Sequence, residues 1–228
     1  MSLDLGVLIS GRGSTLQSLI AACREPAMPA EVVLVVSNRP QAAGLTHASA
    51  AGIATRTIDH RGFADRAAFD AALDAALRQA GVDMVCLAGF MRLLTPAFVD
   101  AWRDRLVNIH PSLLPSFPGL DTHARALAAG VRFAGCTVHL VRAATDSGPI
   151  LVQAAVPVAP DDTPESLAAR VLAAEHRIYP LALRWLAEGR VRVTGERAII
   201  AGTAASPLAC VCPLEPGDGA VAAAPNLG

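Results

Sequence analysis

The sequence contains no lysine, because all 19 of its basic residues are arginine. A Schiff base with a carbonyl substrate or with pyridoxal phosphate requires a lysine amine, and a P-loop requires a lysine beside the phosphates. Sites of these kinds are therefore excluded. Aromatic residues make up only 4 % of the chain, so much of its 53 % apolar content is alanine and other aliphatic residues. Such a composition favours helices over a core rich in aromatic rings.

The chain also lacks long apolar runs and a strong net charge. No run approaches the roughly 18–20 residues that span a bilayer, and the first four residues do not resemble a signal peptide. The formal net charge of −1 predicts no basic surface for nucleic acid. The five cysteines are odd in number and scattered, which indicates a reduced, cytoplasmic protein. Cys210 and Cys212 are too isolated to form a zinc site by themselves.

The first half of the chain alternates apolar, strand-like runs with segments of helical spacing. At 228 residues the chain suits one large domain or two small ones. The expected strands are Leu5–Ile9, Glu31–Ser37, Ile53–Thr57, Asp83–Ala88 and Leu106–His110, and the expected helices are Thr15–Cys23, Gln41–Ala51, Asp65–Ala80 and a short one opened by Thr95-Pro96. This alternation predicts an α/β fold with an open, mostly parallel, Rossmann-like sheet and helices on both faces.

The second half follows a different pattern. The strands at 134–141 and 149–158 have no room for a helix between them, so we expect an antiparallel pair in this half. A short helix at 122–130, a long helix at 163–188 and a small hairpin near 190–200 are also expected. Residues 1–203 would then form one domain. We interpret residues 204–228, which are rich in alanine, proline and glycine, as a poorly ordered tail.

Three polar or loop segments follow directly after predicted parallel strands. They are Ser10–Ser14, Gly89–Leu94 and Asn108–Gly119. Ligands of open α/β sheets bind at the carboxyl ends of the strands, near the point where the strand order reverses. We therefore expect these segments to converge on one crevice.

The segment Asn108–Gly119 carries the residues best suited to catalysis. Asn108 and His110 are two residues apart, so that on an extended backbone both side chains leave from the same face. The amide can donate a hydrogen bond, and the imidazole can move a proton near neutral pH. Acyl or formyl transfer needs such a pair on a rigid loop. On these residues alone, a proline-rich surface loop with an incidental histidine is equally compatible.

The glycine-rich turn Ser10–Ser14 lies between a strand and a helix, which places free backbone N–H groups where a phosphate can bind. It lacks the third glycine of a dinucleotide fingerprint, and a plain tight turn is an alternative. Asp146, in a loop before Gly148, could bring a carboxylate to His110 and fix its tautomer. An aspartate in such a loop is also common as a simple turn residue.

Six motifs together give the chain a family resemblance that covers about residues 5–200. They are Val7–Ser14, Ala88–Arg92, Asn108–Pro115, Pro118–His123, Asp146–Pro149 and Glu175–Pro180. In this order and spacing the chain resembles the phosphoribosylglycinamide formyltransferases, the folate-dependent enzymes of purine synthesis. The resemblance implies the formyltransferase fold and the transfer of a formyl group from 10-formyltetrahydrofolate, a co-substrate, to glycinamide ribonucleotide. It implies no metal.

The resemblance also implies site residues. Asn108, His110 and Asp146 match the catalytic residues of the family. The residues that match ribonucleotide contacts are Gly13, Ser14, Thr15 and Glu175, and those that match folate contacts are Arg66, Met91, Arg92, Leu93, Leu94 and Asn108. The bond between Leu114 and Pro115 is a candidate cis peptide. His139 and His176 could support the pocket or simply pack, and packing is the interpretation we prefer.

The sequence departs from the family pattern at a few positions. Asp121 stands where many members carry histidine, Leu172 where a glutamine can help bind phosphate, and Arg12 and Thr15 where asparagines are common. We expect Arg12 to point into solvent. Some of the phosphate anchoring must therefore come from other residues.

The sequence is also compatible with three other functions. One is formyltetrahydrofolate deformylase, which usually has an additional N-terminal domain. A second is methionyl-tRNA formyltransferase, which adds a C-terminal tRNA-binding domain and a basic surface. A third is a non-catalytic folate- or nucleotide-binding module. We expect small-molecule substrates, no nucleic-acid or membrane partner, and either a monomer or a homodimer.

Overall fold

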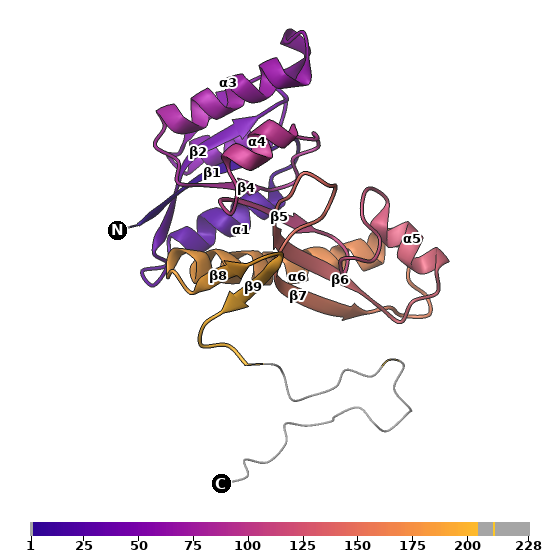
Figure 1. Ribbon diagram of the computed structural model, residues 1–228. Helices are drawn as coiled ribbons and strands as arrows, with labels where there is room; N and C mark the ends of the chain where they lie inside the picture. The colour runs from indigo at the N-terminus through magenta and orange to yellow at the C-terminus, as the bar shows by residue number, and fades with distance from the viewer. Residues whose placement is uncertain (1, 205–211, 213–228) are drawn as a thin grey trace.

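The computed structural model describes residues 2–204 and residue 212 (Figure 1). The predicted tail at 204–228 lies outside the described residues except for its first residue and residue 212. In the described part, no helix is both long enough and apolar enough to cross a membrane.

The first half of the chain alternates strands with helices, as predicted. Its elements are β1 Leu3–Ile9, α1 Ser14–Cys23, β2 Ala30–Ser37, α2 Gly44–Ala50, β3 Ala54–Thr57, the 3₁₀ turn His60–Gly62, α3 Arg66–Gln79, β4 Met84–Leu87, α4 Pro96–Ala101 and β5 Leu106–His110. Two of these helices, α3 and α4, begin where the sequence places a capping side chain. Asp65 accepts a hydrogen bond from the backbone N–H of Ala68 (2.8 Å), and Thr95 accepts one from Phe98 (3.3 Å). These caps explain why the boundaries could be predicted closely.

The second half contains α5 Thr122–Ala128, β6 Phe133–Leu140, β7 Ile150–Pro157, α6 Pro164–Ala187, β8 Val191–Thr194 and β9 Arg197–Ile200. β6 and β7 pair antiparallel, and β8 and β9 form a separate two-stranded hairpin. Both pairings confirm the prediction, because each link is too short for the crossover that parallel strands need.

The main sheet has seven strands in the order β3-β2-β1-β4-β5-β6-β7. The five strands from β3 to β5 are parallel, and β6 and β7 are antiparallel to their neighbours. The chain moves outward in one direction from β1 to β3 and then returns to place β4 on the other side of β1. The strand order therefore reverses between β1 and β4, which is where open α/β sheets bind ligands.

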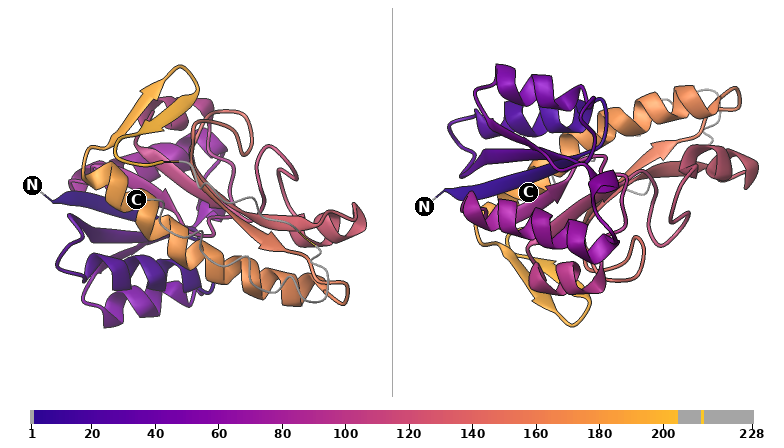
Figure 2. Two further views of the ribbon diagram at one scale, coloured as in Figure 1. Left: turned by 90° about the horizontal axis from the view of Figure 1, so that it is seen from below. Right: turned by 90° about the horizontal axis from the view of Figure 1, so that it is seen from above.

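Helices cover both faces of the sheet, and an apolar core lies under each layer. α1, α2, α5 and α6 pack on one face, where Leu16 and Tyr179 are fully buried. α3 and α4 pack on the other, where Phe69 and Trp102 are buried. Figure 2 shows α6 in front of the sheet in the view from below and α3 in front in the view from above. Both faces of the central strands are thus buried, which is why their sequences are continuous apolar runs.

Candidate active site

The segments that follow β1 and β4 meet at the carboxyl edge of the sheet. The backbone N–H of Ser10 donates to the carbonyl of Gly89 (3.2 Å), and the N–H of Met91 donates to Ser10 Oγ (2.8 Å). β5 lies beside β4 and carries Asn108 opposite Leu87. The three segments expected at this edge therefore follow three adjacent strands, β1, β4 and β5.

His110 and Asp146 lie side by side although 36 positions separate them in the chain. His110 Nδ1 is 3.4 Å from Asp146 Oδ1, and both side chains are largely buried. Asp146 Oδ2 accepts a hydrogen bond from the backbone N–H of Gly119 (2.7 Å), so the carboxylate joins the late loop to the loop after β5. The predicted pairing of a carboxylate with this imidazole is therefore present in the geometry.

The second ring nitrogen of His110 also has an acceptor. His110 Nε2 lies 3.0 Å from the carbonyl oxygen of Phe117, a residue whose φ of 54° turns the loop back over the ring. Carbonyl and carboxylate oxygens only accept hydrogen bonds. A doubly protonated imidazole would thus find a partner for each N–H, and the ring is fixed in orientation.

Asn108 is held by a residue whose role the sequence did not reveal. Asn108 Nδ2 lies 3.3 Å from His139 Nε2, because Asn108 and His139 are directly opposite on β5 and β6. His139 Nδ1 faces the carbonyl oxygens of Ser147 (3.2 Å) and Leu140 (3.3 Å), so Nδ1 carries the proton and Nε2 accepts from the amide. Burial lowers the pKa of His139, which keeps the ring neutral.

The interpretation of His139 as a packing residue was therefore wrong, since its ring binds the Asn108 amide. The signal that could have found it is the strand register, which places it opposite Asn108. One N–H of the Asn108 amide points to His139, and the other remains for a ligand. His176 Nε2, in contrast, is buried without a hydrogen-bond partner, and burial lowers its pKa.

The proline-rich loop after β5 is fastened by Thr137, which sequence reasoning also missed. Thr137 is fully buried opposite His110 on β6. Its Oγ1 donates to the carbonyl of Ser112 (2.7 Å) and accepts from the N–H of Leu114 (3.0 Å) and from Gln153 Nε2 (2.9 Å). The peptide bond before Pro115 is cis, as expected. The loop is rigid because the sheet itself supplies its hydrogen bonds.

The glycine-rich turn has the geometry of an anion site. Gly13 is the N-cap of α1 and has a left-handed backbone with φ 80°, and no side chain caps the helix. Ser14 and Thr15 begin the helix, so their N–H groups are among those that lack intrahelical partners. A Cβ on Gly13 would lie 2.6 Å from Gly44 Cα, which leaves room only for glycine.

Glu175 lies on α6, which packs against α1. Its side chain is buried, and burial raises its pKa to about 7. A carboxyl group in this state can accept or donate hydrogen bonds near neutral pH. Three of the four departures from the family pattern, Arg12, Thr15 and Leu172, lie on or next to the same two helices, whereas Asp121 is the N-cap of α5. Arg12 is exposed, as expected, and Leu172 is half-buried on α6.

The segment after β4, which lies next to β5 and its candidate catalytic residues, exposes apolar side chains. Met91 and Leu93 are more than half exposed, whereas Arg92 and Leu94 are half-buried. Arg92 stacks over the ring of Phe69, 5.9 Å from its centroid, and its Nε is buried without a hydrogen-bond partner. Arg66, the first residue of α3, is exposed. In residues 2–204, no hydrogen bond or ion pair joins Arg66 to the other predicted folate residues.

A buried chain of hydrogen bonds, which the sequence did not predict, holds the segment after β4 against the ends of β1 and β2. Ser10 Oγ, which accepts from the N–H of Met91, donates to Asn38 Oδ1 (2.6 Å). Asn38 Nδ2 in turn lies 3.2 Å from His60 Nδ1. Ser10 and Asn38 are almost completely buried. The chain of hydrogen bonds therefore connects the ends of β1, β2 and β4.

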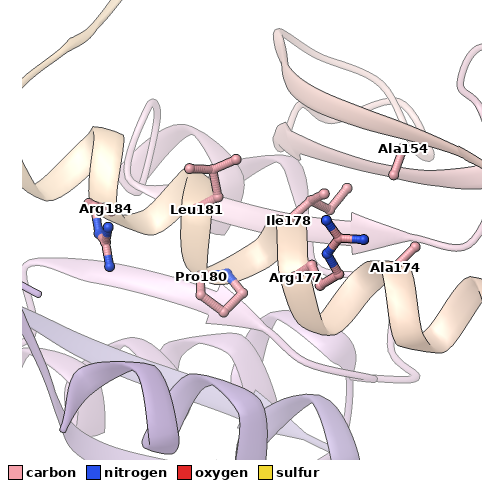
Figure 3. A pocket seen from close by; sticks show the side chains of 7 residues that line it. All are labelled: Ala154, Ala174, Arg177, Ile178, Pro180, Leu181 and Arg184. Carbon is pink, nitrogen blue, oxygen red and sulfur yellow. The ribbon is translucent and has the colours of Figure 1, made fainter. Parts of the chain in front are cut away.

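Two surface hollows lie on the α6–β7 side of the sheet and behind the proline-rich loop. A groove of about 400 Å³ lies between α6 and β7, and Figure 3 shows Arg177 and Arg184 projecting from α6 on either side of Pro180 and Leu181. A smaller cavity of about 80 Å³ lies behind the proline-rich loop and is lined in part by His123. Within residues 2–204 and 212, no three histidine, cysteine, aspartate or glutamate side chains are grouped to hold a metal ion.

Comparisons with known proteins point to one family. A family model described as formyl transferase matches residues 4–183. The chain is 45 % identical over 200 residues to the phosphoribosylglycinamide formyltransferase of Escherichia coli, an alignment that covers 88 % of this chain and 94 % of that protein. It is 52 % identical over 189 residues to the trifunctional purine biosynthetic protein adenosine-3 of Bos taurus. That alignment covers 83 % of this chain but only 19 % of the cattle protein, so the chain spans less than a fifth of its length.

A solved structure of similar sequence has the same fold. The glycinamide ribonucleotide transformylase 1 of Symbiobacterium toebii is 51 % identical and superposes with a TM-score of 0.86, covering 87 % of this chain and 94 % of the other. The predicted fold class is thereby confirmed, including its antiparallel pair in the C-terminal half.

Proposed function

The chain belongs to the formyl transferase family, and we propose that it transfers the formyl group of 10-formyltetrahydrofolate to the amine of glycinamide ribonucleotide. The products are formylglycinamide ribonucleotide and tetrahydrofolate, in purine biosynthesis. One observation carries the proposal. His110 Nδ1 lies 3.4 Å from Asp146 Oδ1, and His110 leaves β5 from the same face as Asn108. The chain that holds these residues is 45 % identical to a phosphoribosylglycinamide formyltransferase along nearly the whole length of that protein.

Asn108 stabilises the charge that develops on the formyl oxygen. The amine attacks the formyl carbon, and the C=O electrons move to oxygen as the tetrahedral intermediate forms. The free N–H of Asn108, aimed by His139, donates to this oxyanion. One such donor contributes ~2.7–4 kcal/mol to the stabilisation of a transition state. Because the amide is already oriented, no reorganisation is needed at the moment of reaction.

His110 and Asp146 together carry out the proton transfers. The attacking amine loses a proton, and N10 of the folate gains one as the C–N10 bond breaks and its electrons return to nitrogen. The imidazolium of His110 supplies a proton, the carboxylate of Asp146 stabilises the positive charge, and the pair returns to its starting state with the proton that the amine releases. Such general acid–base catalysis contributes ~10²–10⁴-fold in rate.

The two substrates approach from different segments. The phosphate of the ribonucleotide binds the N-terminus of α1 at Gly13, Ser14 and Thr15, and Glu175 contacts the ribonucleotide. The folate lies against Met91, Arg92, Leu93, Leu94 and Asn108, where exposed apolar side chains flank the catalytic residues, and it extends toward Arg66. The formyl carbon and the amine then meet beside Asn108 and His110.

We also propose a cytoplasmic location. Cys23, Cys86, Cys136 and Cys212 are free, which suits a reducing compartment. We propose that the protein is either a monomer or a homodimer.

A single assay tests the proposed function. Purified protein is mixed with 10-formyltetrahydrofolate, and the release of tetrahydrofolate is followed by absorbance with and without glycinamide ribonucleotide. Release that depends on the ribonucleotide is the expected result. Release of formate with water alone would identify a deformylase, and the absence of any turnover would leave only a binding module.

A further inference from the structure

Arg142 stands at the start of the loop that carries Asp146, and none of the predicted roles includes it. Its side chain is only 10 % exposed and contacts two carboxylates. Arg142 Nη2 is 2.7 Å from Asp104 Oδ1, and Nε is 2.9 Å from Glu196 Oε2. Asp104 lies just before β5, and Glu196 lies in the turn of the β8–β9 hairpin. Arg142 thus joins three segments that are distant in sequence.

The backbone of Arg142 closes the loop around Asp146. Its N–H donates to the carbonyl of Ser147 (3.1 Å), which also accepts from His139 Nδ1 (3.2 Å). Gly148 makes the closure tight, because a Cβ there would lie 2.0 Å from the carbonyl oxygen of Leu140 and 2.9 Å from Arg142 Cγ. Asp146 itself has φ 49°, which aspartate adopts when its surroundings hold it there.

We propose that Arg142, clamped between Asp104 and Glu196, is a positioning residue that fixes Asp146 against His110. The inference rests on the proposed function. Ionic contacts at exposed sites contribute little. Asp104 and Glu196 are exposed, but the guanidinium of Arg142 between them is nearly buried, and its two contacts restrict its orientation. The β8–β9 hairpin takes part in this positioning, because Glu196 connects it to Arg142 at the start of the loop that carries Asp146.

The test compares variants that break the clamp with a matched variant that does not. Arg142→Gln removes the charge at similar length, and we expect kcat to fall about tenfold, because small displacements of catalytic groups are costly. The KM for the ribonucleotide should remain unchanged. Arg103→Gln is the control, because Arg103 Nη2 contacts the same Glu196 (3.3 Å) from the exposed side without touching the loop. It should leave kcat unchanged.

A double variant separates a clamp from two unrelated contacts. Glu196→Gln alone should lower kcat about threefold, and Arg142→Gln with Glu196→Gln should lower it no further than Arg142→Gln alone, because members of one network are not additive. Losses that multiply, or a lower Tm with unchanged kcat per folded molecule, would overturn the proposal.

A readout that does not depend on activity completes the test. The backbone N–H of Gly119 donates to Asp146 Oδ2, so its hydrogen exchange reports where the carboxylate lies. Exchange should be faster in Arg142→Gln and unchanged in Arg103→Gln. Equal exchange in the wild-type protein and Arg142→Gln would contradict the positioning role. If the wild-type protein fails to transfer formyl to the ribonucleotide, the proposed function fails, while this exchange still decides the role of Arg142.

Discussion

At the scale of single residues, the site depends on hydrogen bonds that leave each functional group with one orientation. His110 has an acceptor at each ring nitrogen, Asp146 has a backbone donor at its second oxygen, and Asn108 is turned by His139. Side chains held in this way keep the geometry that charge stabilisation and proton transfer require. Changing the charge of one group without changing its shape should therefore affect the chemistry more than substrate binding.

Asp146→Asn makes such a change. The amide oxygen can still accept from the N–H of Gly119, but the neutral group no longer stabilises a protonated His110. We expect kcat to fall by about 10²-fold, in the range of general acid–base catalysis, with little change in the KM for the ribonucleotide. Steady-state kinetics measures both. Asp100→Asn, at an exposed position on α4, is the control. Equal losses in kcat and binding would make Asp146 a structural residue instead.

Glu175 makes folding stability depend on pH. Burial raises its pKa from 4.5 to about 7, so between these values the folded protein holds a proton that the unfolded chain has released. The contribution of this group is fully present below pH 4.5 and is lost as pH rises through about 7, a change of about 3 kcal/mol in the free energy of unfolding.

Glu175→Gln should remove that dependence. Urea unfolding at pH 5 and pH 8 should show the variant gaining stability relative to the wild-type protein at the higher pH. Glu25→Gln, at an exposed position, should follow the wild-type protein at both values. A difference between wild-type and Glu175→Gln proteins that is the same at both pH values would show that Glu175 titrates normally.

At the scale of elements, the start of α1 shows how a turn can leave backbone N–H groups free for the proposed phosphate site. The left-handed Gly13 ends the turn, and its contact with Gly44 brings the two loops together without side chains between them. The first N–H groups of the helix are then left for a ligand, and the helix dipole favours an anion there.

Gly13→Ala should damage both the turn and the binding site. The added Cβ meets the Gly44 backbone at 2.6 Å, and the φ of 80° is strained for alanine. We expect a loss of about 1–3 kcal/mol in the free energy of unfolding and a KM for the ribonucleotide raised at least about tenfold, as the loss of a charged hydrogen bond implies. Gly11→Ala is the control for folding, because no atom lies within 4 Å of its added Cβ. If both variants unfold alike, the close contact is unimportant.

At the scale of the whole molecule, the reversal of strand order between β1 and β4 brings the segments of the candidate site to one edge of the sheet. It places the glycine-rich turn after β1 next to the apolar segment after β4, while β5 and the antiparallel β6 bring Asn108 and His139 together. Every residue assigned to the two substrates or to the catalysis lies between positions 13 and 175.

Removal of residues 205–228 should therefore leave the activity intact. None of the assigned residues falls in that segment, so kcat, both KM values and the Tm should match those of the full chain within error. The measurement is a side-by-side assay of the two proteins. A large fall in kcat would show that the segment contributes to the site.

The sequence by itself determined the order of the elements and most of their ends. Apolar periodicity separates strands from helices, and capping residues such as Asp65 and Thr95 mark helix starts through contacts with neighbours three positions away. The identity of Asn108, His110 and Asp146 as candidate catalytic residues also came from the sequence, through motifs whose order and spacing are specific.

Only the tertiary structure decided how those residues are supported. The contacts of His139 with Asn108, of Thr137 with the proline-rich loop and of Arg142 with Asp104 and Glu196 join segments between 23 and 54 positions apart. Such contacts depend on which strands are neighbours and on their register, and a local pattern of apolar and polar residues specifies neither. The chemistry could thus be predicted from short motifs, whereas its positioning is a property of the assembled sheet.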